Sequence, residues 1–550
     1  MEKKMRKLEA VVTRLANDRG SPSIVRQLNE EEGQISPASK ELDTDHEQRQ
    51  NEFRDNGQQI NHWEIVMDLD SGPGAIPGFY ISRTPPAQPG SHMDFISKGV
   101  VSLEKAQEYF DKYQNRLDHF PYRILCDHGS VTLESVRNTS PLLAAAVCTV
   151  GALHSVSKDF DLCYREFVSL CAVQTFSKNN TLDDIRALCI GAFWLNDLSW
   201  TLIGTAVRIA TELQLHKSIF KALQGDKQHY LRTRLWYLVY ACDHHFSVAY
   251  GRPPMTRECE AVKSVRNFLE CEHATEDDAR LVSQVLRWSI CSSIYDTFGV
   301  DVDRPLSDSE VPHLRRFSIA LDSIRAEWVD RFIPNQHVGN YPRKGVTLQY
   351  HFAKLYLCSH VFRGFGSGQV KSRSYEVSME LDEVANAGVL AALSILRAVV
   401  SDDEIQSYLD GLPIYFNVMI AFAAVFLFKV STKFAASVQI DTQEIKRLIA
   451  TLVTTLKRVT SNMHQRHLLV SITRGIDGLL QRCGLADGVS PILPLAQPQA
   501  EIDSDPTIDG LNWSTNQSLD PYFMGEYDFL TSQDVNLDLP FLLDPGPSAS

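Results

Sequence analysis

Cysteine, histidine and aspartate are the residues through which this chain could bind a metal ion or catalyse a reaction. Its eleven cysteines begin at Cys126, and no two of them have the C-x2-C spacing that gathers thiolates around zinc. The nearest approach to a mixed ligand set is Cys242, His244, His245 and Cys259. We expect Cys242 to be a buried thiol and the two imidazoles to lie at the surface, and so to form no metal site.

Paired aspartates are the second chemical candidate, because magnesium prefers clustered carboxylates. Asp183-Asp184, Asp277-Asp278 and Asp402-Asp403 each lack the third acid of a D-D-x-x-D/E helix. We expect these pairs to start helices, where the helix dipole favours negative charge. The sequence also lacks a G-x-S-x-G elbow and a glycine-rich phosphate loop,. It therefore predicts a non-enzymatic protein with no cofactor bound within this chain.

Composition and charge divide the chain into parts. The 550 residues are too many for one core and contain 68 acidic against 54 basic residues,. Eleven of the acids lie after Arg482, where there is no Lys or Arg, so the rest is close to neutral. No strongly basic segment of the kind expected of a nucleic-acid binder stands out. Without close cysteine pairs or a secretion signal, we expect reduced thiols in the cytosol or nucleus.

The elements that must position any site are helices, because apolar residues between 93 and 482 recur with helical spacing and no useful alternation,. The fold class predicted is all-α. We expect a helix after Pro141, another capped by Thr181 and Asp184, and another near 203–215. Further helices are expected at 281–298, 316–331, 347–362, 378–400, 413–430, 442–461 and 463–482. The apolar segment Val418–Phe428 is too short to span a bilayer and predicts a buried helix, with no membrane partner.

The N-terminal part has two predicted segments. In residues 1–17 the apolar side chains follow a heptad, which predicts a short coiled-coil-like dimerisation helix or, alternatively, a frayed helix,. The residues expected to form its seam are Met5, Leu8, Val12 and Leu15. Residues 18–92 are polar, with little periodicity, and predict a disordered linker.

Residues 483–550 form a tail of different character. It is rich in Pro, Asp and Asn yet retains many aromatic side chains. Repulsion between the acids keeps such a segment open, so that a partner can bind the aromatics. The interpretation is a disordered activation tail, against the alternative of an ordinary acidic terminus. The expected contact residues are Trp513, Tyr522, Phe523, Tyr527 and Phe529.

The most specific wording lies in residues 232–253, RTRLWYLVYACDHHFSVAYGRP. Apolar side chains fall on one face and Arg234, Asp243 and His244 on the others, which predicts an amphipathic helix ended by Gly251 and Pro253. The segment resembles the signature block of the fungal zinc-cluster transcription regulators. The matching residues are Arg234, Trp236, Asp243, Ser247, Gly251, Arg252 and Pro253. Tyr237 and His244 depart from that pattern.

The resemblance implies a function and an architecture. Residues 93–482 would be the all-helical regulatory, or middle homology, domain, in which Trp236 and Arg252 anchor the signature helix and its turn. Residues 1–17 would form a homo- or heterodimer. The protein would work in the nucleus as a gene-specific regulator, an activator of RNA polymerase II transcription of a metabolic or biosynthetic gene set. Its partners would be DNA, transcriptional coactivators and a small-molecule effector.

One departure from the family concerns DNA itself. The family reads DNA through six cysteines that hold two zinc ions, and no cysteine precedes Cys126 here,. We expect either that the start is truncated within the dimerisation helix, with zinc as cofactor of an upstream cluster, or that the protein reaches DNA through a partner. Two other classes stay open: a co-regulator without a DNA reader that heterodimerises with full-length relatives, and a small-molecule-sensing helical protein.

Overall fold

The structure is a computed structural model that describes residues 94–125, 131–299, 301, 304–363, 375–433 and 441–482. All of them belong to one of two compact units, the unit Leu69–Ser550. The predicted dimerisation helix 1–17, the linker 18–92 and the tail 483–550 lie outside the described residues. Their predicted boundaries and roles therefore stay predictions.

The described residues form helices joined by loops and contain no strand, only one isolated bridge between Asn335 and Gly339. This confirms the all-α prediction. The α-helices are α4 (Leu103–Lys112), α5 (Leu133–Thr139), α6 (Pro141–His154), α7 (Phe160–Thr175), α8 (Leu182–Trp194), α9 (Ser199–Glu212), α10 (Ile219–Ala222), α11 (Lys227–Ala249), α12 (Glu260–Lys263), α13 (Glu276–Phe298), α14 (Val311–Trp328), α15 (Tyr341–Ser359), α16 (Tyr375–Ser401), α17 (Asp403–Tyr408), α18 (Ile414–Lys433), α19 (Thr442–Thr460) and α20 (Leu468–Arg482). A π-helical turn, Tyr113–Leu117, extends α4.

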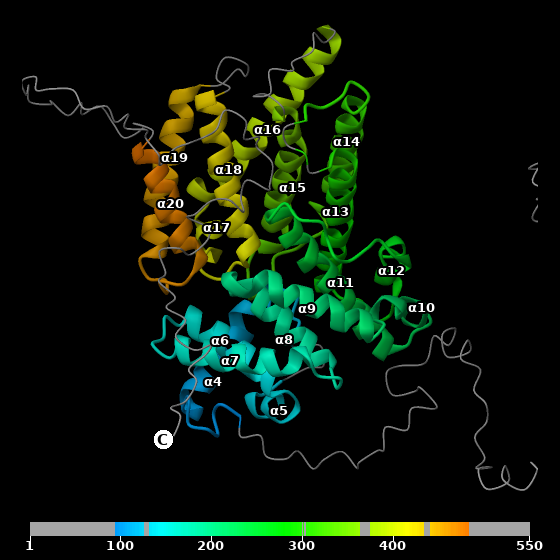
Figure 1. Cartoon of the computed structure of the whole chain (residues 1–550), viewed down its shortest axis with the longest axis vertical. Coiled ribbons are helices and arrows are strands. Elements are labelled where there is room, and N and C mark those ends of the chain that lie inside the picture. Colours follow the sequence, from blue (N-terminus) through cyan, green and yellow to red (C-terminus); the bar gives the residue numbers. More distant parts are fainter. Residues whose placement is uncertain are drawn as a thin grey trace, which may run out of the picture. The chain divides into compact units, whose positions relative to one another are not determined.

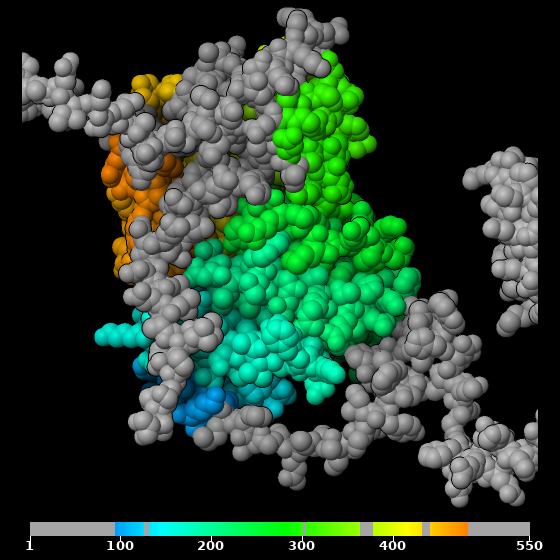
Figure 2. Space-filling view, in the orientation of Figure 1, coloured from blue at the N-terminus to red at the C-terminus, as the bar shows by residue number. Residues whose placement is uncertain are grey.

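The helices form two groups that share α11. Helices α4–α9 pack on one another at one end, while α13–α16 and α18–α20 stand alongside one another (Figure 1). The helix α11 contacts α8 and α9 of the first group and α13 and α18 of the second. In Figure 2 the cyan and green side chains of these helices meet without a gap. The indole of Trp194 at the end of α8 donates to the carbonyl of Gly411, 3.1 Å away, and also joins the groups.

Local signals set several helix starts as expected. Pro141 occupies the first turn of α6, and Thr181 with Asp184 forms a complete capping box at α8,. The acidic pairs Asp183-Asp184 and Asp277-Asp278 lie in the first turns of α8 and α13, and Asp402 is the N-cap of α17. The prediction that these pairs are helix-start charges is confirmed.

The beginning of the domain differs from the sequence prediction in two ways. Apolar residues have helical spacing from residue 93 onward, but residues 94–101 form turns and α4 begins after Ser102, whose hydroxyl accepts from the amide of Lys105. The helix Phe160–Thr175 was not predicted. Only three of its residues are buried, and its aromatic, acidic and polar residues carry little apolar periodicity,.

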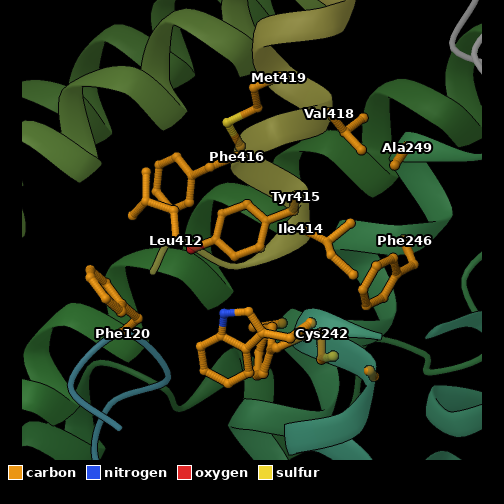
Figure 3. Packing of buried hydrophobic residues seen from close by; sticks show 14 of the residues in the cluster. Phe120, Cys242, Phe246, Ala249, Leu412, Ile414, Tyr415, Phe416, Val418 and Met419 are labelled. Carbon is orange, nitrogen blue, oxygen red and sulfur yellow. The ribbon is translucent and has the colours of Figure 1, made fainter. Parts of the chain in front are cut away.

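The core contains the long apolar helix α18. Its segment Ile414–Ser431 is long and apolar enough to cross a membrane, yet all of it is buried inside the structure, which confirms the prediction of a buried helix. A second segment that passes the same test, Ser378–Ser401 of α16, is half buried. Figure 3 shows Ile414, Tyr415 and Phe416 of α18 pointing into the core that also receives Phe246 of α11.

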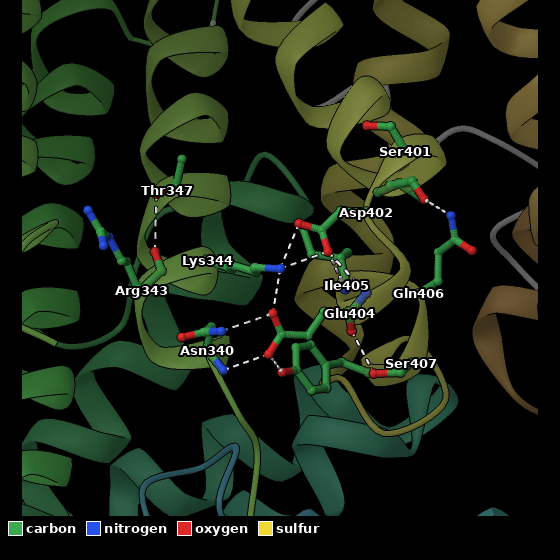
Figure 4. Close-up of polar contacts among 12 residues, drawn as sticks. Asn340, Arg343, Lys344, Thr347, Ser401, Asp402, Glu404, Ile405, Gln406 and Ser407 are labelled. Carbon is green, nitrogen blue, oxygen red and sulfur yellow. Dashed lines mark hydrogen bonds and ion pairs between the residues drawn. The ribbon is translucent and has the colours of Figure 1, made fainter. Parts of the chain in front are cut away.

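A polar junction fixes α15 against the corner between α16 and α17 (Figure 4). The Lys344 ammonium lies 2.7 Å from a carboxylate oxygen of Asp402 and 2.5 Å from one of Glu404. Glu404 also accepts from the backbone amide of Asn340 and from the Tyr408 hydroxyl. Burial raises the pKa of Glu404, but these bonds outweigh it and lower the pKa to about 2.

Candidate functional site

The signature helix α11 is buried on every side from Tyr230 to Ala249, apart from Arg232, which is partly exposed. The prediction of an amphipathic helix with a polar surface face was therefore wrong. The reason is its place between the two helix groups, where neighbouring helices cover both the apolar and the polar face. A buried polar group must be hydrogen-bonded or pay its desolvation free energy, so the partners of these polar residues define the site.

Arg234 makes the central ion pair of the site. Its Nε donates to Oδ1 of Asp278 at 2.5 Å, and Asp278 on α13 is completely buried. Oδ2 of Asp278 accepts from the Tyr230 hydroxyl at 2.5 Å and from the amide and hydroxyl of Thr275 at 2.8 and 2.6 Å. One carboxylate therefore caps α13 and binds it to α11.

The same guanidinium holds a loop in an unusual conformation. Nη2 of Arg234 donates to the carbonyl of Tyr122. Tyr122 and Arg123 have φ of 62° and 56°, a region that costs a non-glycine residue about 1–2 kcal/mol,. Arg280 of α13 donates to the carbonyl of His119 in the same loop, at 3.0 Å. Two buried arginines thus stabilise backbone strain next to the signature helix.

Asp243 ties the helix to the chain that follows it. Its Oδ2 accepts from the backbone amide of Thr256 at 2.7 Å and from the Thr256 hydroxyl at 2.6 Å. Burial raises the pKa of Asp243, and the two bonds from Thr256 oppose that rise. The aspartate therefore has a structural role, because it holds the loop that carries Gly251, Arg252 and Pro253 against α11.

The turn after α11 is a Schellman motif, which explains the spacing from Ser247 to Pro253. The amide of Arg252 donates to the carbonyl of Ser247 at 2.9 Å, and the amide of Gly251 donates to that of Val248 at 3.4 Å,. Gly251 has φ of +60°, which favours glycine,. Pro253 cannot continue a helix and follows where the chain must leave it.

Trp236 and Arg252 both contact aromatic rings. The Arg252 guanidinium lies 4.7 Å from the ring centre of Trp200 and 5.6 Å from that of Tyr250, in cation–π contact,. Trp236 is buried, and its ring centre is 5.6 Å from that of His216. Trp236 therefore lies in the core and Arg252 over the rings of Trp200 and Tyr250, and their anchoring role stays a prediction.

The histidines of the signature helix contradict the expectation of surface imidazoles. His244 and His245 are each 2% exposed. His244 shares a hydrogen bond of 2.7 Å with the hydroxyl of Ser292, and burial lowers its pKa to about 3. They are covered because α13 and α18 pack on this face. Cys242 is a buried thiol, as predicted.

Metal chemistry finds no support in the described part of the chain. The residues resolved between 94 and 482 contain no group of three or more His, Cys, Asp or Glu side chains that could hold an ion. The nine cysteines described there are all free thiols. The predicted dimerisation residues Met5 to Leu15 and the activation residues Trp513 to Phe529 lie outside the described residues, so the structure does not place them.

Sequence reasoning missed the partners of the signature residues. Asp278, Thr256 and Tyr122 lie 44, 13 and 112 residues from the signature side chains they contact. A signal for Asp278 was present, since Thr275-x-x-Asp278 is a complete capping box,. No local pattern indicates that its carboxylate also pairs with Arg234.

A buried all-helical body organised around this signature defines the regulatory, or middle homology, domain of fungal transcription factors of the zinc-cluster type. More specifically, residues 99–477 match the PRTT-like family, described as the middle domain of the transcriptional activator of proteases prtT, and the chain belongs to that family. No solved structure matches the chain.

Two curated relatives support this assignment. The chain is 39% identical over 400 residues to the transcriptional activator of proteases prtT of Emericella nidulans, an alignment covering 71% of this chain and 59% of the relative. It is 22% identical over 357 residues to the transcriptional regulatory protein SEF1 of Candida albicans, covering 61% of this chain and 36% of that protein. The match therefore spans less than two thirds of either relative's length.

Proposed function

We propose that this protein is a nuclear, gene-specific regulator of transcription by RNA polymerase II, acting as an activator. The observation that carries the proposal is the family match over residues 99–477, together with a signature helix that Arg234 and Asp243 tie to the rest of the helical body. The first relative is named an activator of proteases, so protease genes are the target set to test first.

The proposed division of labour follows the chain. Residues 93–482 form a body that senses an effector or partner, and the tail 483–550 contacts coactivators. Binding to the body shifts the exposure of the tail because the bound molecule has different affinities for two states of the protein. DNA is reached through a zinc cluster outside this chain or through a partner protein, with residues 1–17 as the dimer contact. No enzymatic step and no cofactor within this chain is part of the proposal.

A tethered reporter tests the tail. The full chain fused to an unrelated DNA-binding domain should raise reporter output, and deleting 483–550 should abolish the rise. Replacing the five predicted contact aromatics with Ala, while keeping every acid, should have the same effect as deletion. The matched control replaces five neighbouring polar residues with Ala: Ser514, Thr515, Asn516, Gln517 and Ser518. If the aromatic variant, whose net charge is unchanged, still activates the reporter, or if the polar control loses activation, the proposed role of the aromatics is refuted.

A second experiment addresses DNA and target genes. Transcripts of protease genes should fall when the gene for this protein is deleted, and chromatin immunoprecipitation should place the protein at their promoters. If the chain is absent from promoters but co-purifies with a zinc-cluster relative through residues 1–17, the co-regulator alternative replaces the activator. Unchanged protease transcripts would reject that target set.

A further inference from the structure

A buried arginine on α13 lacks an acidic partner. The side chain of Arg287 is 1% exposed, and burial lowers its pKa to about 10. Its Nη1 donates to Oε1 of Gln349 at 2.9 Å, whereas its Nη2 has no hydrogen-bond partner in the structure. The side chains whose charge acts on it within the described residues are Cys291, Tyr122 and Tyr415, all neutral at pH 7 in a buried site.

The other buried arginines of this region show what is missing. Arg234 pairs with Asp278 at 2.5 Å, and Arg280, about two turns before Arg287 on α13, pairs with Asp277 at 2.8 Å,. A buried charge without a counter-charge destabilises a fold by several kcal/mol. An arginine kept in that position therefore indicates a counter-charge that comes from a bound molecule.

The cluster around Arg287 contains two glutamine amides and several aromatic rings. Gln349 accepts from both Gln284 and Arg287 through Oε1, and its amide donates to the Tyr415 hydroxyl at 3.1 Å. His245 stacks on Tyr415, with ring centres 3.8 Å apart, and burial lowers the pKa of its imidazole while a hydrogen bond with Gln284 opposes this. Figure 3 shows the Tyr415 ring reaching into the core among apolar side chains.

The cluster joins four helices. His245 lies on α11, Arg287 on α13, Gln349 on α15 and Tyr415 on α18. The indole of Trp288, next to Arg287, donates to Oε1 of Gln284 at 3.2 Å and has its ring centre 4.6 Å from that of His245. An unsatisfied guanidinium nitrogen in a cluster that also holds the rings of His245, Trp288 and Tyr415 matches the chemistry of a carboxylate carried on an apolar or aromatic body,.

We propose that Arg287 binds the carboxylate of a small aromatic organic acid, with His245 and Gln349 as neighbouring polar contacts. The inference deepens the proposed function, since it names the effector class that the helical body would sense. Because packed side chains surround Arg287, the acid binds a state in which the four helices separate. Such binding shifts the equilibrium between the closed and open states.

The test uses the purified full chain and phenylacetate as probe, with the neutral phenylacetamide at the same concentration. Phenylacetate should raise the thermal midpoint in a saturable way, and phenylacetamide should not. Replacing Arg287 with Met (R287M) should weaken phenylacetate binding, measured by calorimetry, at least about tenfold, because a charge-assisted bond is lost. R287K keeps the charge without the planar fork and should lie between the two.

A matched variant separates this site from general effects of buried charge. R280M removes a buried arginine that has an acidic partner, so it should lower the thermal midpoint while leaving the phenylacetate Kd within about twofold. Without any acid added, R287M should be as stable as the wild type or more so, because it removes an unpaired cation.

Three results would overturn the proposal. These are no shift with phenylacetate, an equal shift with phenylacetamide or with inorganic phosphate, and binding that survives in R287M. Binding is measured without DNA or a reporter, so it can fail while the tethered reporter still responds. Conversely, a protein that binds phenylacetate through Arg287 but does not activate would leave the site intact and reject the transcriptional role.

Discussion

Removing the Arg234 guanidinium should destabilise the domain far more than removing an exposed arginine. R234M leaves the carboxylate of Asp278 completely buried without its cation and frees the Tyr122 carbonyl. Breaking a buried pair by deleting one partner costs about 3–5 kcal/mol. Asp278 keeps its bonds from Tyr230 and Thr275, so we expect a loss near the lower limit, about 3 kcal/mol.

Urea unfolding of the full chain, followed by circular dichroism and tryptophan fluorescence, measures this loss. The control is R266M, because Arg266 also pairs with a carboxylate, that of Glu327, through two hydrogen bonds, but the two side chains are 55% and 37% exposed. We expect that variant to lose less than about 1 kcal/mol. The double variant R234M/D278N removes the stranded charge and should be less destabilised than the sum of the single variants by about 1.5 kcal/mol. Equal losses for R234M and R266M, or full additivity in the double variant, would refute the reasoning.

Three further predictions concern other buried positions of the domain. G251A should lower stability by about 1 kcal/mol, because a side chain is strained at φ of +60°,. In G151A the new Cβ would lie 2.1 Å from a backbone oxygen of α4, so its thermal midpoint should fall well below that of the control G204A, whose Cβ meets a methionine sulfur at 3.4 Å,. Burial lowers the pKa of His154 to about 4 and of His467 to about 3. The unfolded chain therefore binds more protons than the folded chain below about pH 6.5. The free energy of unfolding, measured with urea, should fall by about 2 kcal/mol per histidine between pH 7 and pH 5. Replacing both with Gln should reduce that loss by their combined contribution while other buried histidines, such as His244, still titrate. A wild-type stability unchanged at pH 5 would contradict the argument.

The fold was largely readable from the sequence because its signals are local. Helical periodicity, the Pro141 start and the Thr181 capping box each act within a few residues, and each is present in the structure. The helix Phe160–Thr175 escaped because few of its side chains are buried. A helix that buries only a narrow row of side chains has few apolar residues at helical spacing, so its sequence gives a weak periodic signal.

The surroundings of the signature helix were not readable, and the reason is physical. Periodicity assigns Asp243 and His244 to a polar face, and in most helices that face meets water. Here the face meets α13 and the loop to Thr256, and both residues have partners there. Whether a polar face is wet or buried depends on contacts between segments far apart in the sequence, which one sequence read locally does not reveal.

The signature residues are therefore best explained by the contacts through which they join two groups of helices. Arg234 joins α11 to the start of α13 and to the strained backbone of Tyr122, while Asp243 and Gly251 fix the end of the same helix. Arg287 lies on α13 less than three turns after Asp278,. A ligand that draws α13 away from α15 must then pull on Arg234 and on the loop that it holds in an unfavourable conformation. Strain that persists only while its partners stay in place is released when they move, so the ligand proposed at Arg287 would act on α11 through the contacts of Arg234 with Asp278 and Tyr122.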